Sequence, residues 1–488
     1  MTGISRRNFI RTGAIATAGG IALAGPFQGV VARANGVPLR SNREALLGPL
    51  GAVKDQRDGV VRLALPKGYT YRSFGVAGGL MSDGTLTPGL QDGMAAFRGP
   101  RGTTRLVRNH EVRGEGTPIG ASPEIRAKAY DGNTLGGTST LSIDSKSREL
   151  IGDWVSLTGT SVNCAGGPTP WGTWISAEET VNGPDLTADF TGTDGPAALK
   201  RHGYLYEVDP RWNAGELGQA LPVRSAGRFA HEAVAYDRTT NALFQTEDNF
   251  EFPSGVYRYL PPENAMRTKR LTDGGVLQQL RVVGIPNAEL GRPQPPGAMY
   301  TVDWVTIDDP DWDFGPGPTD NDLGIQEVGR QGFEQGAAAF ARPEGIWERA
   351  GLIYFAATRG GGDQLDGNLF GEYGNGFGQI WVLDPKANEL SLLFESPGPE
   401  VLDLPDNLTL SPRGNVILCE DGPIDNFVRG LTRDGELFDF AKNLIAGQER
   451  QEFAGACFSP DGNTLFVNIQ YRSGLTFAIW REHGGLFL

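Results

Sequence analysis

The sequence predicts an all-β fold, a β-propeller of five or six blades with loop insertions, and it favours six. The chain contains 70 glycines and 32 prolines among 488 residues, which indicates many turns. Apolar stretches with helical spacing are short and scattered. Strand–turn–strand units recur along the chain, and irregularly spaced repeats of this kind are typical of propeller blades. A pair of β-sandwiches is the alternative.

The repeating unit has an acidic residue, an apolar strand, a turn rich in Pro, Asp, Arg or Gly, and a second apolar strand. It is found at residues 232–247, 344–358 and 406–420, and again at 456–468, where Glu452 lies just ahead. The turns match those of β-hairpins. Residues 203–210, 255–261 and 378–385 are predicted to be later strands that end at a proline. The spacing between units predicts insertions, the largest at about 262–333.

Acidic residues stand at the head of these units. In a propeller the inner strand of every blade lines the central axis, so equivalent residues from distant stretches converge there. Glu232, Glu344, Asp406 and Glu452 would then crowd several negative charges together, an arrangement that is strongly repulsive without cations. The sequence therefore predicts metal ions on the axis.

Two histidines directly precede a glutamate, in His110-Glu111 and His231-Glu232. Because successive side chains of a strand point to opposite faces, the two members of a pair do not bind one ion together. We expect the glutamate to face the axis and the histidine to support it from behind.

The segment 164–179 contains a second set of candidate metal ligands, which includes a thiol. It begins at Cys164, continues through a loop rich in Gly and Pro, and ends at Glu178 and Glu179. Oxygen ligands suit calcium, whereas a thiolate suits a softer, redox-active metal such as iron. A mixed cluster follows if both face the axis; the alternative is a buried structural cysteine beside solvated glutamates. Cys419 and Cys457 lie in apolar strand-like runs and are expected to be buried without a metal role.

The amino terminus predicts export. Residues 1–34 combine a twin arginine, Arg6-Arg7, with a mildly apolar core and a small-x-small exit site at 32–34. This combination indicates a Tat signal peptide, handled by the Tat export machinery, and leaves 35–488 as a single catalytic propeller domain in the periplasm or outside the cell. The apolar core is too short for a stable membrane anchor. Without the four signal arginines the net charge changes from −14 to −18, which argues against nucleic acid as a partner.

Several motifs occur together in one order: Asn109-His110-Glu111, Asn163-Cys164, His231-Glu232, Arg342-Pro343-Glu344, Asp406, Glu452-x-x-Gly455 and residues 466–470. From about residue 90 to the end this series resembles that of the PhoX-type alkaline phosphatases, a family of exported, Tat-dependent propeller enzymes. The resemblance implies calcium and iron on the axis and metal-assisted hydrolysis of a small phosphate monoester. The implied metal ligands are Glu111, Cys164, Glu178 or Glu179, Glu232, Glu344, Asp406 and Glu452.

The resemblance also assigns two residues to the substrate side. Arg342 falls where the family has an arginine that could hold phosphate, and Asn109 lies beside a ligand and could assist. The chain departs from the family pattern at Ala230 and Gln91, where relatives often carry a basic residue and a histidine. These departures bear on substrate contacts more than on the metal site.

Two other functions remain open from the sequence. A sugar-lactonase type of calcium propeller would hold one ion and would leave Cys164 without a role. A non-enzymatic exported propeller would use calcium only to stabilise its blades. A monomer is expected in each case, because a closed propeller pairs its own strand edges.

Overall fold

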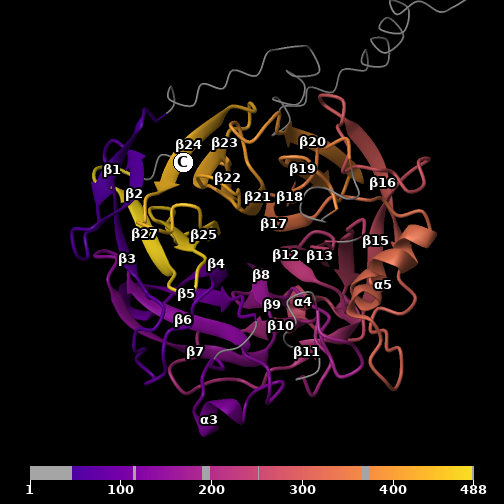
Figure 1. Ribbon diagram of the computed structural model, residues 1–488, viewed down its shortest axis with the longest axis horizontal. Coiled ribbons are helices and arrows are strands. Elements are labelled where there is room, and N and C mark those ends of the chain that lie inside the picture. The colour runs from indigo at the N-terminus through magenta and orange to yellow at the C-terminus, as the bar shows by residue number, and fades with distance from the viewer. Residues whose placement is uncertain (1–46, 114–116, 190–197, 251, 365–372, 486–488) are drawn as a thin grey trace, which may run out of the picture.

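The computed structural model describes residues 47–113, 117–189, 198–250, 252–364 and 373–485. It confirms an all-β, propeller-like architecture in which sheets radiate from a central axis (Figure 1). The predicted signal peptide, residues 1–34, lies outside the described residues. Within the described chain no helix has both the length and the apolar composition needed to cross a membrane.

Three sheets are built from the first part of the chain and from its middle. The first contains β4 (Gln91–Arg98), β5 (Thr103–His110), β6 (Gly136–Asp144) and β7 (Leu150–Thr160). The second contains β8 (Asn163–Pro168), β9 (Trp174–Glu178), β10 (Leu205–Val208) and β11 (Pro222–Val223). The third has nine strands: β12 (His231–Asp237), β13 (Ala242–Glu247), β14 (Val256–Leu260), β15 (Val276–Val282), β16 (Met299–Thr306), β17 (Pro343–Arg349), β18 (Leu352–Ala357), β19 (Gln379–Asp384) and β20 (Glu389–Glu395).

The two remaining sheets of the described chain join its two ends. One consists of β21 (Pro405–Leu410), β22 (Val416–Glu420), β23 (Phe427–Leu431) and β24 (Leu437–Asn443), extended by β2 (Val61–Pro66) and β1 (Leu50–Lys54). The other consists of β25 (Phe453–Phe458), β26 (Leu465–Ile469) and β27 (Leu475–Arg481), completed by β3 (Tyr69–Phe74). Because β3 pairs with β27 along its whole length, the N-terminal part of the chain closes the last sheet.

The helices of the described chain are short. They are α3 (Pro123–Arg126), α4 (Ala265–Thr268), α5 (Asn321–Glu334) and the 3-10 turns η1 (Pro100–Gly102) and η2 (Arg224–Ala226). The expected insertion at 262–333 contains α4, β15, β16 and α5 (Figure 1). Within it, β16 pairs with β15 on one side and with β20 on the other, and so joins two antiparallel meanders into the nine-stranded sheet.

Hairpin turns of the expected kind connect the strands. In the turn between β21 and β22 the N–H of Gly414 donates to Ser411 O at 2.8 Å, and Gly414 has a φ of +86°. Gly462 makes the equivalent bond to Ser459 in the turn between β25 and β26. Apolar residues of neighbouring sheets pack together behind these turns, and Cys419 and Cys457 are buried among them as expected.

The inner strands form a closed ring. Strands β4, β8, β12, β17, β21 and β25 contact one another in cyclic order around the axis. Their close approach requires small residues: a Cβ on Gly93 would overlap Ala165, and one on Gly345 would lie 2.6 Å from Asp406 O. A cavity of about 20 Å³ lies between these strands, with room for about one water. The inner strands therefore pack closely around the axis.

A buried ion pair fixes the second sheet. Glu178 accepts hydrogen bonds from Ser161 N (2.8 Å), Gly203 N (2.8 Å) and His202 Nδ1 (2.7 Å). The other ring nitrogen of His202 lies 3.5 Å from Asp131 Oδ2, and all three side chains are buried. Burial lowers the pKa of His202, but Glu178 and Asp131 outweigh it and raise the pKa to about 9.

This ion pair predicts a pH-dependent stability. Because the folded pKa of His202 exceeds the ordinary 6.5, its contribution is complete below pH 6.5 and is lost as the pH rises through 9. We expect His202→Gln to lower the free energy of unfolding by about 3 kcal/mol at pH 6.5, and by much less at pH 9.5. Urea unfolding of both proteins at both pH values measures this. An equal difference at the two pH values would contradict the assignment.

Candidate metal centre

Each inner strand carries a β-bulge near its start. The register shifts between Gln91 and Met94, Asn163 and Gly166, His231 and Val234, Pro343 and Ile346, Pro405 and Leu408, and Ala454 and Cys457. A bulge redirects the side chains of the residues that it leaves outside the ladder. The first residue of each bulge is, in order, Asp92, Cys164, Glu232, Glu344, Asp406 and Gly455. Five equivalent positions therefore carry an acid or a thiol.

The backbone just before these bulges is strained. Leu90, Val162, Arg342 and Leu404 each lie two residues ahead of a bulge acid or thiol and have φ between 47° and 51°. Left-handed φ is rare for residues other than glycine, and a β-branched residue such as Val162 is an outlier there. Strain of this kind costs roughly 1–3 kcal/mol per residue and collects at functional sites. The rest of the fold holds the bulges in this conformation.

The acids and the thiol form four overlapping groups among the described residues. The ligand atoms of each group lie within 4.8 Å of one another. The groups are Asp92–Glu111–Cys164, Cys164–Glu179–Glu232, Glu232–Glu344–Asp406 and Asp406–Asp421–Glu452. Cys164, Glu232 and Asp406 each belong to two groups, so the four form one continuous chain across the axis. The first two groups are largely buried and the fourth is partly open to solvent.

A second source of ligands is the residue that follows the second strand of a sheet. Acidic pairs end β9, β13 and β22: Glu178-Glu179, Glu247-Asp248 and Glu420-Asp421. In each pair the first acid is buried and accepts backbone N–H groups, such as Gly203 N, Gly255 N and Asp403 N. In two of the pairs the second acid, Glu179 or Asp421, joins the groups of candidate ligands, and in the third pair Asp248 binds Arg342. This alternation explains why Glu179 joins the groups and Glu178 does not.

The structure thus brings together seven of the predicted metal ligands: Glu111, Cys164, Glu179, Glu232, Glu344, Asp406 and Glu452. Two further members, Asp92 and Asp421, were not predicted. Asp92 precedes a glycine and an apolar strand, as Glu344 does, and Asp421 is the second acid of a pair, as Glu179 is. The sequence therefore contains a pattern that could have predicted each of these two acids.

Burial and mutual repulsion dominate the electrostatics. Burial, followed by the charge of neighbouring carboxylates, raises the pKa of Asp92, Glu232 and Glu344 well above the ordinary range. The same two causes raise the pKa of the Cys164 thiol. Asp92 Oδ1 and Glu232 Oε1 are buried and have no hydrogen-bond partner in the described chain. Such oxygens are costly unless a cation binds them, so the residues fit a metal cluster.

The two residues predicted on the substrate side occupy different positions. Arg342 donates to both carboxylate oxygens of Asp248, at 2.8 and 2.6 Å, and lies 3.0 Å from Glu344. Asn109 is buried behind Cys164: its amide donates to Cys164 O and Ala165 O and accepts from Trp174 Nε1 at 2.9 Å. Arg342 therefore borders the cluster, whereas Asn109 holds the bulge of β8 in place.

Both histidines of the His-Glu pairs lie behind the cluster. His110 bonds Gly89 O at 2.9 Å and Ser139 Oγ at 2.8 Å, and His231 bonds Gly227 O at 3.0 Å. Burial lowers the pKa of His231 to about 3, so it is neutral at physiological pH. Neither histidine belongs to a group of candidate ligands.

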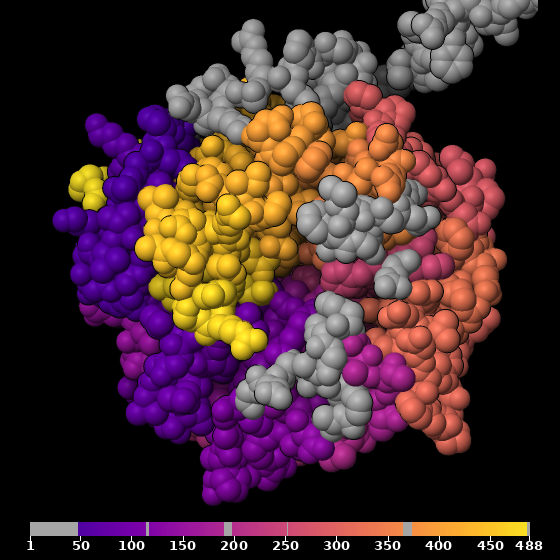
Figure 2. All heavy atoms as spheres, viewed as in Figure 1, coloured from indigo at the N-terminus to yellow at the C-terminus, as the bar shows by residue number. Residues whose placement is uncertain are grey.

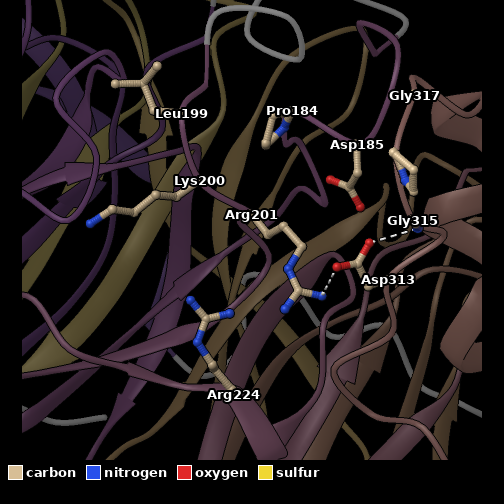
Figure 3. Close-up of a pocket in the computed structure, with 10 residues that line it drawn as sticks. Pro184, Asp185, Leu199, Lys200, Arg201, Arg224, Asp313, Gly315 and Gly317 are labelled. Carbon is tan, nitrogen blue, oxygen red and sulfur yellow. Dashed lines mark hydrogen bonds and ion pairs between the residues drawn. The ribbon is translucent and has the colours of Figure 1, made fainter.

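A groove lies to the side of the second sheet, lined by Lys200, Arg201 and Arg224 with Asp185 and Asp313 (Figure 3). Its cations already have partners. Arg201 donates to Trp312 O at 2.8 Å and pairs with Asp311 and Asp313, while Arg224 donates to the hydroxyls of two tyrosines. The charges of this groove are therefore balanced by neighbouring residues, unlike the crowded carboxylates on the axis. Figure 2 shows that the surface of the molecule is hollowed at the axis.

The chain is similar to known proteins in sequence and in fold. The family model described as alkaline phosphatase PhoX matches residues 48–472. A solved structure of Pseudomonas fluorescens PhoX in complex with vanadate, a transition state analogue, is 20% identical with a TM-score of 0.63, and the match covers 90% of this chain and 99% of that one. A gluconolactonase from Xanthomonas campestris is 11% identical over 88% of this chain and 98% of that one, with a TM-score of 0.37. No curated protein matches by sequence.

The family match spans most of the chain and confirms the resemblance carried by the motif series. It identifies the protein as a phosphoester hydrolase. The chain belongs to the alkaline phosphatase PhoX family.

Proposed function

We propose that the protein hydrolyses phosphate monoesters with a calcium and iron cluster held on the propeller axis. The observation that carries the proposal is the chain of four overlapping groups, in which eight carboxyl groups and one thiol lie close together. The donor set supports both metals, because carboxylate oxygens suit calcium and a thiolate suits iron. The solved structure of Pseudomonas fluorescens PhoX in complex with vanadate, a transition state analogue, supports phosphoryl chemistry.

The residues divide into two ends. Cys164, with Asp92, Glu111, Glu179 and Glu232, would hold iron at the buried end, and the carboxylates from Glu232 to Glu452 would hold calcium toward the open end. Bound cations neutralise phosphate oxygens and lower the pKa of water. The other contributions come from the chain itself: the burial of Asp92, Cys164 and Glu232 keeps bulk water away from the iron end, and Asn109 holds the bulge that presents Cys164.

Arg342 is the proposed phosphate-binding residue. Its guanidinium borders the third group through Glu344. Burial raises the pKa of Asp421 in the fourth group to about 6, and the charge of Arg342 partly opposes this rise. Asp248 fixes the planar group through two hydrogen bonds, so little conformational freedom is lost when an oxyanion binds. A guanidinium held in this way suits a phosphate at the mouth of the axis.

We also propose a blade number and a cellular location for the protein. Counting the nine-stranded sheet as two blades joined by β16 gives six blades in one domain, and the ring of inner strands supports this count. The twin-arginine segment supports Tat export to the periplasm or beyond. We also propose a monomer, because a closed propeller pairs its own strand edges.

Metal dependence is tested directly on the exported protein. We expect both calcium and iron in elemental analysis, and hydrolysis of p-nitrophenyl phosphate that falls at least tenfold after dialysis against a chelator and returns when the metals are restored. Calcium alone with lactone turnover would favour a lactonase. Calcium with neither activity would favour a structural propeller.

The thiolate assignment has a matched control in the same chain. We expect Cys164→Ala to lower the iron content several-fold and to reduce hydrolysis, because the buried end loses its soft ligand. Cys457→Ala removes a buried cysteine that belongs to no group of ligands, and it should keep both metals. Elemental analysis of the two variants decides the point; unchanged iron in Cys164→Ala would refute the assignment.

A further inference from the structure

Arg113 is a cationic side chain that contacts two carboxylates of the acidic cluster. Arg113 Nε donates to Glu111 Oε1 at 2.6 Å, and its Nη2 donates to Glu179. Glu111 belongs to the first group of ligands and Glu179 to the second, and the two groups share Cys164. Arg113 therefore links candidate ligands that come from two different sheets, at the buried end of the cluster.

The backbone holds Arg113 close to these acids. β5 ends at His110, and the N–H of Val112 turns back to donate to His110 O at 2.8 Å. The side chain of Val112 packs against the apolar cluster of Met81, Ile119 and Val155. With its neighbour anchored, Arg113 is a tethered cation rather than a mobile surface side chain, and only 21% of its side chain is exposed.

Arg113 and a cation would compete for the same carboxylates. Glu111 Oε1 accepts from Arg113, and Glu111 Oε2 accepts from Gln470 Nε2 at 2.8 Å. Both oxygens of this ligand are thus engaged by donors of the chain, and Glu179 is paired with the same guanidinium. An incoming cation must share or displace these bonds, and it meets a fixed positive charge nearby.

Arg342 differs in this respect. Its guanidinium is paired through two hydrogen bonds with Asp248, which belongs to none of the four groups, and it lies 3.0 Å from one candidate ligand, Glu344. Arg342 thus shares its charge with a carboxylate outside the four groups, whereas both ion pairs of Arg113 are with candidate metal ligands.

We propose that Arg113 is a built-in counter-cation that stabilises the metal-free cluster and thereby weakens cation binding at its buried end. The inference rests on the proposed function, because it requires a cation site at these carboxylates. It makes Arg113 a residue that determines affinity: its charge holds the acids together when cations are scarce, and the cost of displacing it sets the concentration at which the site fills.

The test compares charge with shape at one position. Full-length protein is freed of metal with a chelator and titrated with ferrous iron by calorimetry under anaerobic conditions, and its thermal unfolding is followed with and without iron. We expect Arg113→Gln to unfold at a lower temperature when metal-free and to bind ferrous iron about tenfold more tightly, since the repelling charge is gone. Arg113→Lys keeps the charge and should resemble the wild type in both measurements.

Arg211→Gln is the control, because Arg211 is exposed and pairs with Asp209 away from the axis. If metal-free Arg113→Gln does not stay folded, its affinity is measured by chelator competition from the iron-loaded form. Unchanged or weaker iron binding in Arg113→Gln, or equal effects of the Lys and Gln substitutions, would overturn the proposal. A wild type that binds no cation would instead overturn the proposed function.

Discussion

Eight carboxyl groups and one thiol meet on the axis of this protein, and their mutual repulsion is the constraint on which the rest of the structure depends. In water such groups repel weakly, but burial removes the screening and makes each charge costly. The raised pKa values of Asp92, Glu232 and Glu344 express this cost. The fold keeps these groups together nevertheless, which is physically reasonable for a site built to hold cations.

The geometry that imposes this crowding is the closed ring of inner strands. A bulge at the same place in each strand turns one side chain toward the axis. In four of the strands, a residue with a left-handed φ, such as Val162, lies two positions before that side chain. Where the sixth bulge meets the first, Gly455 takes the place of an acid, because a Cβ there would overlap the carbonyl of Asp92. Glu452 then reaches the fourth group from just before the strand. The ring thus determines both where acids can stand and where they cannot.

The fold class and several of the acids on the axis could be predicted from the sequence. The repeated pattern of an acid before an apolar strand identified Glu232, Glu344 and Asp406, and alternation along a strand correctly put the histidines behind the glutamates. These signals are local, since they depend on neighbours in the chain. The all-β, propeller-like class follows from the same repeats and is confirmed by the sheets.

The other features of the site and fold could not be predicted from the sequence, because they depend on tertiary contacts. Only the pairing of β9 with β10 shows that Glu178 faces backbone N–H groups while Glu179 faces the axis. The role of Asn109 requires the bulge of β8 to be known, since the side chain binds the carbonyls of that bulge. Likewise, the pairing of β3 with β27 joins residues some 400 positions apart, and no local pattern in the sequence predicts this pairing.

The central claim is that one cluster of cations lies among these acids. Anomalous diffraction at the iron edge, from crystals of the exported protein, tests it most directly. The account predicts an anomalous peak within bonding distance of Cys164 Sγ, with calcium density between Glu232, Glu344 and Asp406. Iron peaks elsewhere in the protein, or an axis without metal in a protein that hydrolyses phosphate esters, would contradict it.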